Sequence, residues 1–124
     1  MLAGHESVQH LAAACDPQDA QESGILAVES SVAVWLVADR VVAASGYQAW
    51  HGHLGHLSVL VDPAFRGRGL GKAVAARAVA QVLDAGLVPQ WRARSTLQAS
   101  RQIARTLGFV ELGRQATYQL AWPW

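Results

Sequence analysis

The stretch of sequence that decides the fold runs from Val59 to Lys72 and reads VLVDPAFRGRGLGK. An apolar run is ended by an Asp-Pro pair, and a turn with three glycines then opens a helix. Glycines let the backbone adopt positive φ and approach a ligand closely, and the first amides of a helix have no internal partners. Together with the helix dipole and the basic side chains of Arg66, Arg68 and Lys72, these amides predict an anion site suited to a pyrophosphate.

Two common phosphate-binding loops do not fit the same glycines. A P-loop places Ser or Thr after its lysine to bind Mg²⁺, whereas Lys72 is followed by Ala73. The dinucleotide fingerprint needs G-x-G-x-x-G, whereas the glycines here are Gly67, Gly69 and Gly71. An Arg-Gly-rich RNA-binding loop is the remaining alternative, and the apolar strand before the turn and the amphipathic helix after it argue against that alternative.

Short strands and helices are predicted on both sides of this stretch. In order, the predicted elements begin with a helix at 6–14, a loop or second short helix at 16–24, and strands at 32–37, 41–50 and 57–61. A helix from Leu70 to the C′ residue Gly86 follows, and then a strand at 88–94. The last predicted elements are a helix from the N-cap Ser95, with Gln98 in its capping box, to Gly108, and a hairpin at 109–113 and 116–120. Hairpins combined with helical crossovers predict an α/β (α+β) fold with a mixed sheet flanked by helices. The length of 124 residues fits a single domain at 1–124.

Two segments of the chain carry a family resemblance. Residues 66–71 read RGRGLG, and residues 100–110 read SRQIARTLGFV. The first is similar to the R/Q-x-x-G-x-G/A signature of the GNAT superfamily of acyl-CoA-dependent N-acetyltransferases, and the second resembles that family's closing S…A-x-x-LGF segment. The order of elements also matches, over residues 32–121. The resemblance implies a mostly antiparallel, twisted sheet with splayed central strands, acetyl-CoA as co-substrate and no metal.

The resemblance also implies roles for individual residues. The strand at 88–94 would diverge from the strand that ends at 61, and the gap would hold the thioester. Ser100 would lie near the CoA. The pantetheine arm would pair with the backbone of Val59, Leu60 and Val61. The pyrophosphate would be wrapped by Arg66, Gly67, Arg68, Gly69, Leu70, Gly71 and Lys72.

The chain departs from the family's pattern at three places. Leu97 stands where the family often has Asn, and Ala104 stands where many members have a Tyr that protonates the departing thiolate. A thiol with a pKa of about 8.5 leaves without an acid, so the loss slows the reaction and does not forbid it. The sequence also begins late, so we expect the first strand and helix to be abbreviated or missing, with residues 24–29 as a possible substitute. A missing edge strand favours a homodimer, or descent from half of a longer protein.

Histidines cluster just before the strand at 57–61. His51, His53 and His56 lie close in sequence, and in this family that strand can supply the general base. His56 is the candidate because it opens the strand. The spacing also allows a metal site, but the family is metal-free and we expect none. Trp91 is placed by the resemblance where it could shape the acceptor pocket.

Composition and charge argue against several classes of protein. No apolar run reaches the ~18 residues of a membrane span, and no secretory signal is visible. The single Cys15 cannot form an internal disulfide, which suits the cytoplasm, and nothing near it in the sequence indicates a nucleophile. Net charge is +1, yet most basic residues follow Arg66, which implies an anionic partner. RNA is disfavoured because no aromatic platform is interleaved with the basic residues.

The sequence therefore predicts an N-acyltransferase. An amine of an unidentified acceptor would attack the thioester of acetyl-CoA directly in a ternary complex, with His56 or a water chain as base. The alternative is a non-catalytic acyl-CoA-binding or regulatory module on the same fold, suggested by Leu97, Ala104 and the short N-terminal part.

Overall fold

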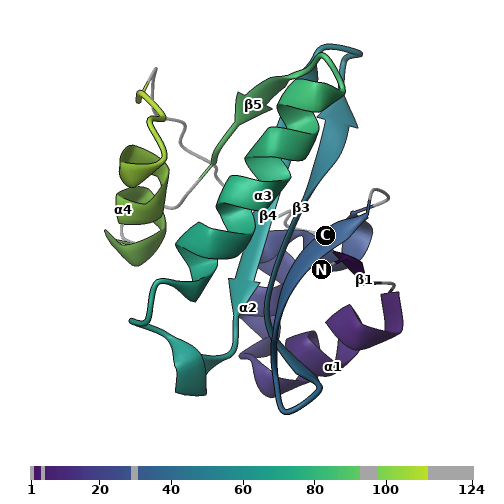
Figure 1. Cartoon of the computed structure of the whole chain (residues 1–124), viewed down its shortest axis with the longest axis vertical. Helices are drawn as coiled ribbons and strands as arrows, with labels where there is room; N and C mark the ends of the chain where they lie inside the picture. The colour runs from purple at the N-terminus through teal and green to yellow at the C-terminus, as the bar shows by residue number, and fades with distance from the viewer. Residues whose placement is uncertain (1, 4, 29–30, 93–97, 112–124) are drawn as a thin grey trace, which may run out of the picture.

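One five-stranded sheet organises the chain, with strand order β1-β2-β3-β4-β5 (Figure 1). The computed structural model describes residues 2–3, 5–28, 31–92 and 98–111. Its elements are β1 Leu2–Ala3, α1 His5–Ala14, α2 Pro17–Ser23, the 3-10 turn η1 Ile25–Ala27, β2 Val32–Val37, β3 Arg40–Trp50, β4 Leu54–Val61, the 3-10 turn η2 Pro63–Phe65, α3 Leu70–Asp84, β5 Val88–Gln90 and α4 Gln98–Thr106.

The sheet is mixed, as predicted. Strands β1 to β4 pair antiparallel, and β5 joins β4 in parallel through the crossover helix α3. Strands β2 and β3 are joined by a two-residue turn at Ala38 and Asp39, which both have positive φ (50° and 63°). This left-handed pair matches the twist of the strands it connects. The long β3–β4 hairpin forms the centre of the sheet.

Helices cover both faces of the sheet. On one face, α1, α2 and η1 bury a core that includes Val8, Leu11, Ile25 and Leu60. On the other face, α3 crosses β3 and β4, and Leu57 packs against its apolar side (Figure 1). Because side chains alternate along a strand, the even positions of β4 face α1 and α2, and the odd positions face α3.

Helix α3 lies unusually close to β4. A Cβ atom built on Gly55 would come within 2.5 Å of Cγ1 of Val82, so only a residue without a side chain fits there. The buried side of α3 carries small residues, including Ala75 and Ala78, which permit this approach. The helix ends where predicted: Gly86 has a φ of 75°, and the amide of Leu87 donates to the carbonyl of Val82.

The N-terminal part begins with a short strand. The first strand is abbreviated and not missing, since β1 pairs with β2 at Leu2↔Ala33 and Ala3↔Val32. Residues 24–28, the described part of the suggested substitute, form no strand. Gly24 ends α2 in the left-handed conformation, and η1 follows with Ile25 buried. A second helix, α2, therefore precedes the central strands.

The C-terminal part is only partly described. The strand predicted at 88–94 ends at Gln90, because Trp91 turns toward α4 and donates a hydrogen bond to Ser100. The expected N-cap Ser95, Leu97 and residues 112–124, which hold most of the predicted hairpin, lie outside the described residues. Gly108 follows α4 with a φ of 94°. Among the helices that the structure describes, none is long and apolar enough to cross a membrane.

Candidate functional site

The candidate site begins where β4 and β5 separate. Their last paired residues are His56 and Gln90, and β4 continues to Val61 without a β5 partner among the described residues. The predicted splay of the central strands is therefore confirmed. The fork opens toward η2 and the N-terminus of α3, so one strand connects the gap to the glycine-rich turn.

The backbone of β4 presents alternate residues to this fork. The amide of Asp62 donates to the carbonyl of Val42 at 2.8 Å, so even-numbered residues exchange hydrogen bonds with β3. The peptide groups of Leu60 accordingly face β3, opposite Ala44. Those of Val59 and Val61 face the open side. An extended ligand arm could add to β4 there as a further strand would.

Arg66 ties this end of β4 to α2. Its Nε donates to the carbonyl of Val61 at 3.2 Å, and its Nη2 lies 3.6 Å from a carboxylate oxygen of Asp19. The thiol of Cys15 points to the same carbonyl at 3.6 Å. Burial raises the pKa of the Cys15 thiol despite the nearby Arg66 charge, so the thiol stays neutral. The carbonyl of Val61 is thus already occupied from the protein side.

The glycine-rich turn forms an open cradle. Gly67 and Gly69 have φ values of 80° and 78°, and a Cβ on either would meet nothing within 4 Å. Gly69 is the N-cap of α3, and the amide of Ala73 makes the first helical bond, to the carbonyl of Gly69 at 3.1 Å. The amides of residues 70–72 therefore have no intrahelical partner and are available to an anion.

Gly71 sets how closely this first turn packs. A Cβ on Gly71 would lie 3.0 Å from Cδ1 of Ile103 in α4 and 3.3 Å from Cγ2 of Val61. The first turn of α3 is therefore in contact with both β4 and α4. Lys72, one residue further on, is exposed.

Charged side chains and the ring of Phe65 contact one another beside the glycine-rich turn. The buried carboxylate of Asp62 accepts from the amide of Ala64 at 2.9 Å and pairs with Arg40 at 3.5 Å. The guanidinium groups of Arg40 and Arg68 lie 5.8 Å and 5.1 Å from the ring centroid of Phe65. The roles of Arg40 and Phe65 were not predicted from the sequence. The Asp-Pro pair was a signal for the cap, but the contact with Arg40 depends on the β3–β4 pairing, which places Val42 beside Asp62.

On the other side of the fork, α4 is fixed to the end of β5. The Trp91 indole donates to the hydroxyl of Ser100 at 3.2 Å, and its ring packs against Phe109 at 5.6 Å between centroids. Ser100 therefore lies beside the fork, with its hydroxyl bonded to Trp91. Ala104 is buried and provides no hydroxyl where the family often has one.

His56 stands at the branch point of the fork. Its ring stacks on Trp50 with 4.1 Å between centroids, and Arg92 lies 5.5 Å over the same indole. Burial, with a smaller contribution from the Arg92 charge, lowers the pKa of His56 below its ordinary value, so the imidazole is neutral near pH 7. Its Nδ1 is buried and has no hydrogen-bond partner among the described residues. A neutral imidazole with a free lone pair can accept a proton.

The three histidines of the sequence cluster do not act together. The rings of His51 and His53 lie 6.4 Å apart in the β3–β4 turn, and Nδ1 of His53 is 2.8 Å from the carbonyl of His51. His56 stacks on Trp50 instead. Within the described residues, no three His, Cys, Asp or Glu side chains gather in a way that could hold a metal ion.

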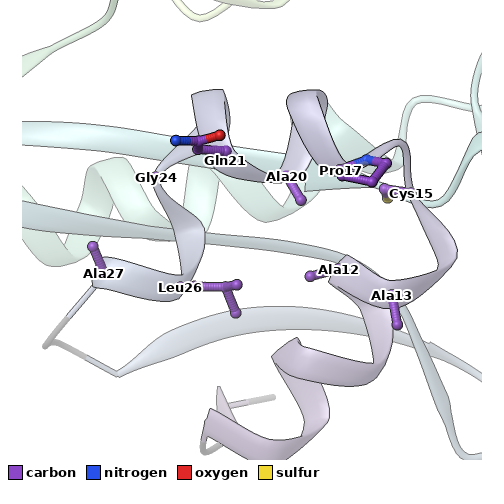
Figure 2. A pocket seen from close by; sticks show the side chains of 9 residues that line it. All are labelled: Ala12, Ala13, Cys15, Pro17, Ala20, Gln21, Gly24, Leu26 and Ala27. Carbon is purple, nitrogen blue, oxygen red and sulfur yellow. The ribbon is translucent and has the colours of Figure 1, made fainter.

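An apolar pocket of about 540 Å³ lies between α1, α2 and η1 (Figure 2). Its lining includes Ala12, Cys15, Ala20, Gly24 and Leu26. No residue of β4 or of the glycine-rich turn lines it. The pocket is therefore separate from the fork and the cradle.

Comparisons with known proteins agree with this geometry. A family model described as GNAT acetyltransferase matches residues 33–118. An acetyltransferase of the GNAT family from Novosphingobium aromaticivorans has a TM-score of 0.72 at 20% identity, over 89% of this chain and 50% of its own. This chain thus spans half the length of that protein. A search of the curated protein sequences finds no match.

Two further solved structures are similar over most of both chains. A ribosomal-protein-alanine N-acetyltransferase from Brucella melitensis has a TM-score of 0.70 at 21% identity, over 91% of this chain and 85% of its own. The aminoglycoside N-acetyltransferase AAC(6')-Iy in complex with CoA has a TM-score of 0.69 at 18% identity, over 98% of both chains. These likenesses show a shared fold, and the family model covers well over half of the sequence. The chain belongs to the GNAT acetyltransferase family.

Proposed function

We propose that this chain transfers an acetyl group from acetyl-CoA to an amine of an acceptor molecule. The observation that carries the proposal is the fork itself: β4 separates from β5 at His56↔Gln90 and runs directly to the unpaired amides of α3. An extended arm bound to the peptide groups of Val59 and to the amide of Val61, with its phosphates on residues 66–72, would place its thioester near the branch point. Leu60 would support the arm from the β3 side of the strand.

The proposed chemistry needs only groups that this arrangement supplies. The acceptor ammonium first loses a proton to His56, directly or through water. The neutral nitrogen then attacks the thioester carbonyl carbon, a C–N bond forms, and the C–S bond breaks. The nitrogen then gives up its second proton, the sulfur leaves as the CoA thiolate and takes up that proton, and His56 returns the first proton to water. The products are an N-acetyl amine and CoA. Since Ala104 offers no acid, the thiolate departs unaided.

The acceptor class is proposed from chemistry and from the relatives. Two proteins of similar fold are named as N-acetyltransferases, one of ribosomal-protein alanine and one of aminoglycosides. A neutral His56 suits an acceptor that arrives as an ammonium ion. We therefore expect turnover with a primary amine.

The test combines binding and turnover. Calorimetry with acetyl-CoA and with CoA measures the donor site, and thiol release measures transfer to a panel of spermidine, an aminoglycoside, an Ala-initiated peptide and a lysine-containing peptide. We expect acetyl-CoA to bind in the micromolar range and at least one amine to be acetylated. No binding at millimolar acetyl-CoA would refute the donor site.

A second function is favoured by Ala104, which leaves the departing thiolate without an acid. In this alternative the chain binds acyl-CoA and regulates a partner without catalysis. Binding of acetyl-CoA with no turnover across the amine panel supports the alternative. Turnover that His56→Gln removes supports the enzyme.

The edge of the sheet at β2 suggests a homodimer. Among the described residues, strand β1 pairs with Val32 and Ala33 alone, and beyond them Trp35 and Val37 are 43% and 39% exposed. An edge with exposed apolar side chains favours pairing with a second copy. Light scattering should give a dimer, and Trp35→Lys should weaken it. A wild-type monomer at all concentrations contradicts this assembly.

The remaining expectations concern surroundings and partners. We place the activity in the cytoplasm, because the single Cys15 is a buried neutral thiol that suits a reducing compartment. We expect no nucleic-acid partner, since Arg66 and Arg68 are engaged with Asp19 and Phe65 at the turn. A salt-sensitive complex with RNA that acetyl-CoA displaces would contradict that expectation.

A further inference from the structure

The last paired residues of β4 and β5 hold two buried polar atoms that lack partners. Nδ1 of His56 and Oε1 of Gln90 are both shielded from solvent, and neither has a hydrogen-bond partner among the described residues. A buried polar atom without a partner costs free energy, so protein interiors rarely contain two neighbouring ones. Their coincidence at the branch point indicates that something else satisfies them.

The two side chains lie next to each other. His56 and Gln90 are register partners in a parallel pair, so both project from the same face of the sheet, about 5 Å apart along the hydrogen-bonding direction. That face carries α1, α2 and η1, because Ser58 on the same side of β4 approaches Gly24. The stack of His56 on Trp50 fixes the plane of the imidazole.

Both atoms act as acceptors. The Gln90 oxygen has only lone pairs, and a neutral imidazole with its proton on Nε2 offers a lone pair at Nδ1. Burial and the facing Arg92 charge keep the His56 ring neutral, and His51 and His53 in the adjacent turn are the other titratable groups near this end of β4. One group with two hydrogens on a single atom could satisfy both acceptors together.

We infer that Gln90 is an acceptor-binding residue: its oxygen accepts one hydrogen of the acceptor ammonium, while Nδ1 of His56 accepts the hydrogen that it then removes. This inference rests on the proposed function and names the residue that holds the acceptor beside the base. After the proton transfer the imidazolium can only donate, so Gln90 is the acceptor of the pair that still holds the neutral amine. The loss of Gln90 should therefore weaken acceptor binding and leave the donor site unchanged.

The first experiment measures acceptor binding. For each panel amine that turns over, such as the Ala-initiated peptide, the KM for the amine and the KM for acetyl-CoA are measured in wild type and in Gln90→Leu. We expect Gln90→Leu to raise the KM for the amine about tenfold while the KM for acetyl-CoA stays unchanged. Gln81→Leu is the matched control, because the Gln81 oxygen is also buried without a partner among the described residues but belongs to α3 on the other face. An amine KM that is the same in wild type and Gln90→Leu overturns the inference and leaves the proposed function intact.

The second experiment needs no acceptor. The pKa of His56 is measured by NMR on protein with ¹⁵N-labelled histidine. In Gln90→Glu, a carboxylate beside the ring should raise that pKa by about one unit, because an opposite charge favours the imidazolium. Gln81→Glu should leave it unchanged. If Gln90→Glu leaves the His56 pKa where it is in the wild type, the two side chains are not neighbours and the inference fails, whether or not the chain is an acetyltransferase.

Discussion

The two ends of β4 are built on opposite plans. At the end near Val61, the polar side chains are paired: Asp62 caps η2 and pairs with Arg40, and Arg66 binds both a carbonyl and Asp19. At the end near His56, two polar side-chain atoms are buried without partners among the described residues. On the proposed function, the cofactor end would be organised before any ligand binds, whereas the acceptor end would be completed by its ligand.

The largest effect is expected at Gly71. A side chain there would press on Ile103 and Val61, so Gly71→Val should displace the first turn of α3 and lower acetyl-CoA affinity about 100-fold, with a loss of about 1–3 kcal/mol in unfolding free energy. Calorimetry and denaturant unfolding measure the two effects. Ala76→Val, at an exposed position of the same helix, is the control. Unchanged affinity in Gly71→Val would show that the turn is not organised by this packing.

The second-largest effect is expected at His56, at the proposed acceptor end of β4. His56→Gln removes the proposed base and keeps a polar side chain, so kcat should fall about 100-fold while the affinity for acetyl-CoA stays within twofold. Steady-state rates measure kcat, and calorimetry measures the affinity for acetyl-CoA. His53→Gln, in the exposed turn, should retain wild-type rates. Equal losses in acetyl-CoA affinity and in kcat would mean that the two ends of β4 do not function independently.

A smaller effect is expected from removing the contacts of Asp62 beside the glycine-rich turn. Asp62→Ala removes the cap on Ala64 and leaves Arg40 without its carboxylate, at a cost of about 1 kcal/mol, and should weaken acetyl-CoA binding several-fold. Arg40→Gln keeps the cap and loses the ion pair and the contact with Phe65, so it should have the weaker effect. The opposite ranking would place the organising role on Arg40.

The smallest effect is a shift in pH dependence. Because burial is the main cause of the lowered His56 pKa and Arg92 the lesser one, Arg92→Gln should raise that pKa slightly. The base would then stay protonated to a higher pH, and the acid limb of the kcat/KM profile should move upward. Arg105→Gln on the exposed side of α4 should leave the limb in place. A downward shift in Arg92→Gln would contradict a neutral base at His56.

Much of the fold could be predicted from local patterns. The glycine-rich turn between an apolar strand and α3 predicted the cradle, and Gly86 predicted the end of the helix. Other features depend on pairing between distant strands. Arg40, the exposed first residue of β3, meets Asp62 because β3 pairs with β4 as far as Val42 beside Asp62, and Gln90 is a candidate site residue only through its register with His56. The two residues of β1 are too few to give a periodic signal.

The close approach of α3 at Gly55 also has a consequence for protein engineering. Because the odd positions of β4 lie under α3, with Gly55 against Val82, a library that varies them would mostly return unfolded clones. The even positions, such as His56, face the other layer, and Gln48 and Gln90 flank His56 on the neighbouring strands. Directed evolution toward a new acceptor should therefore randomise Gln48 and Gln90 and keep His56, the proposed base, and the odd positions of β4 constant.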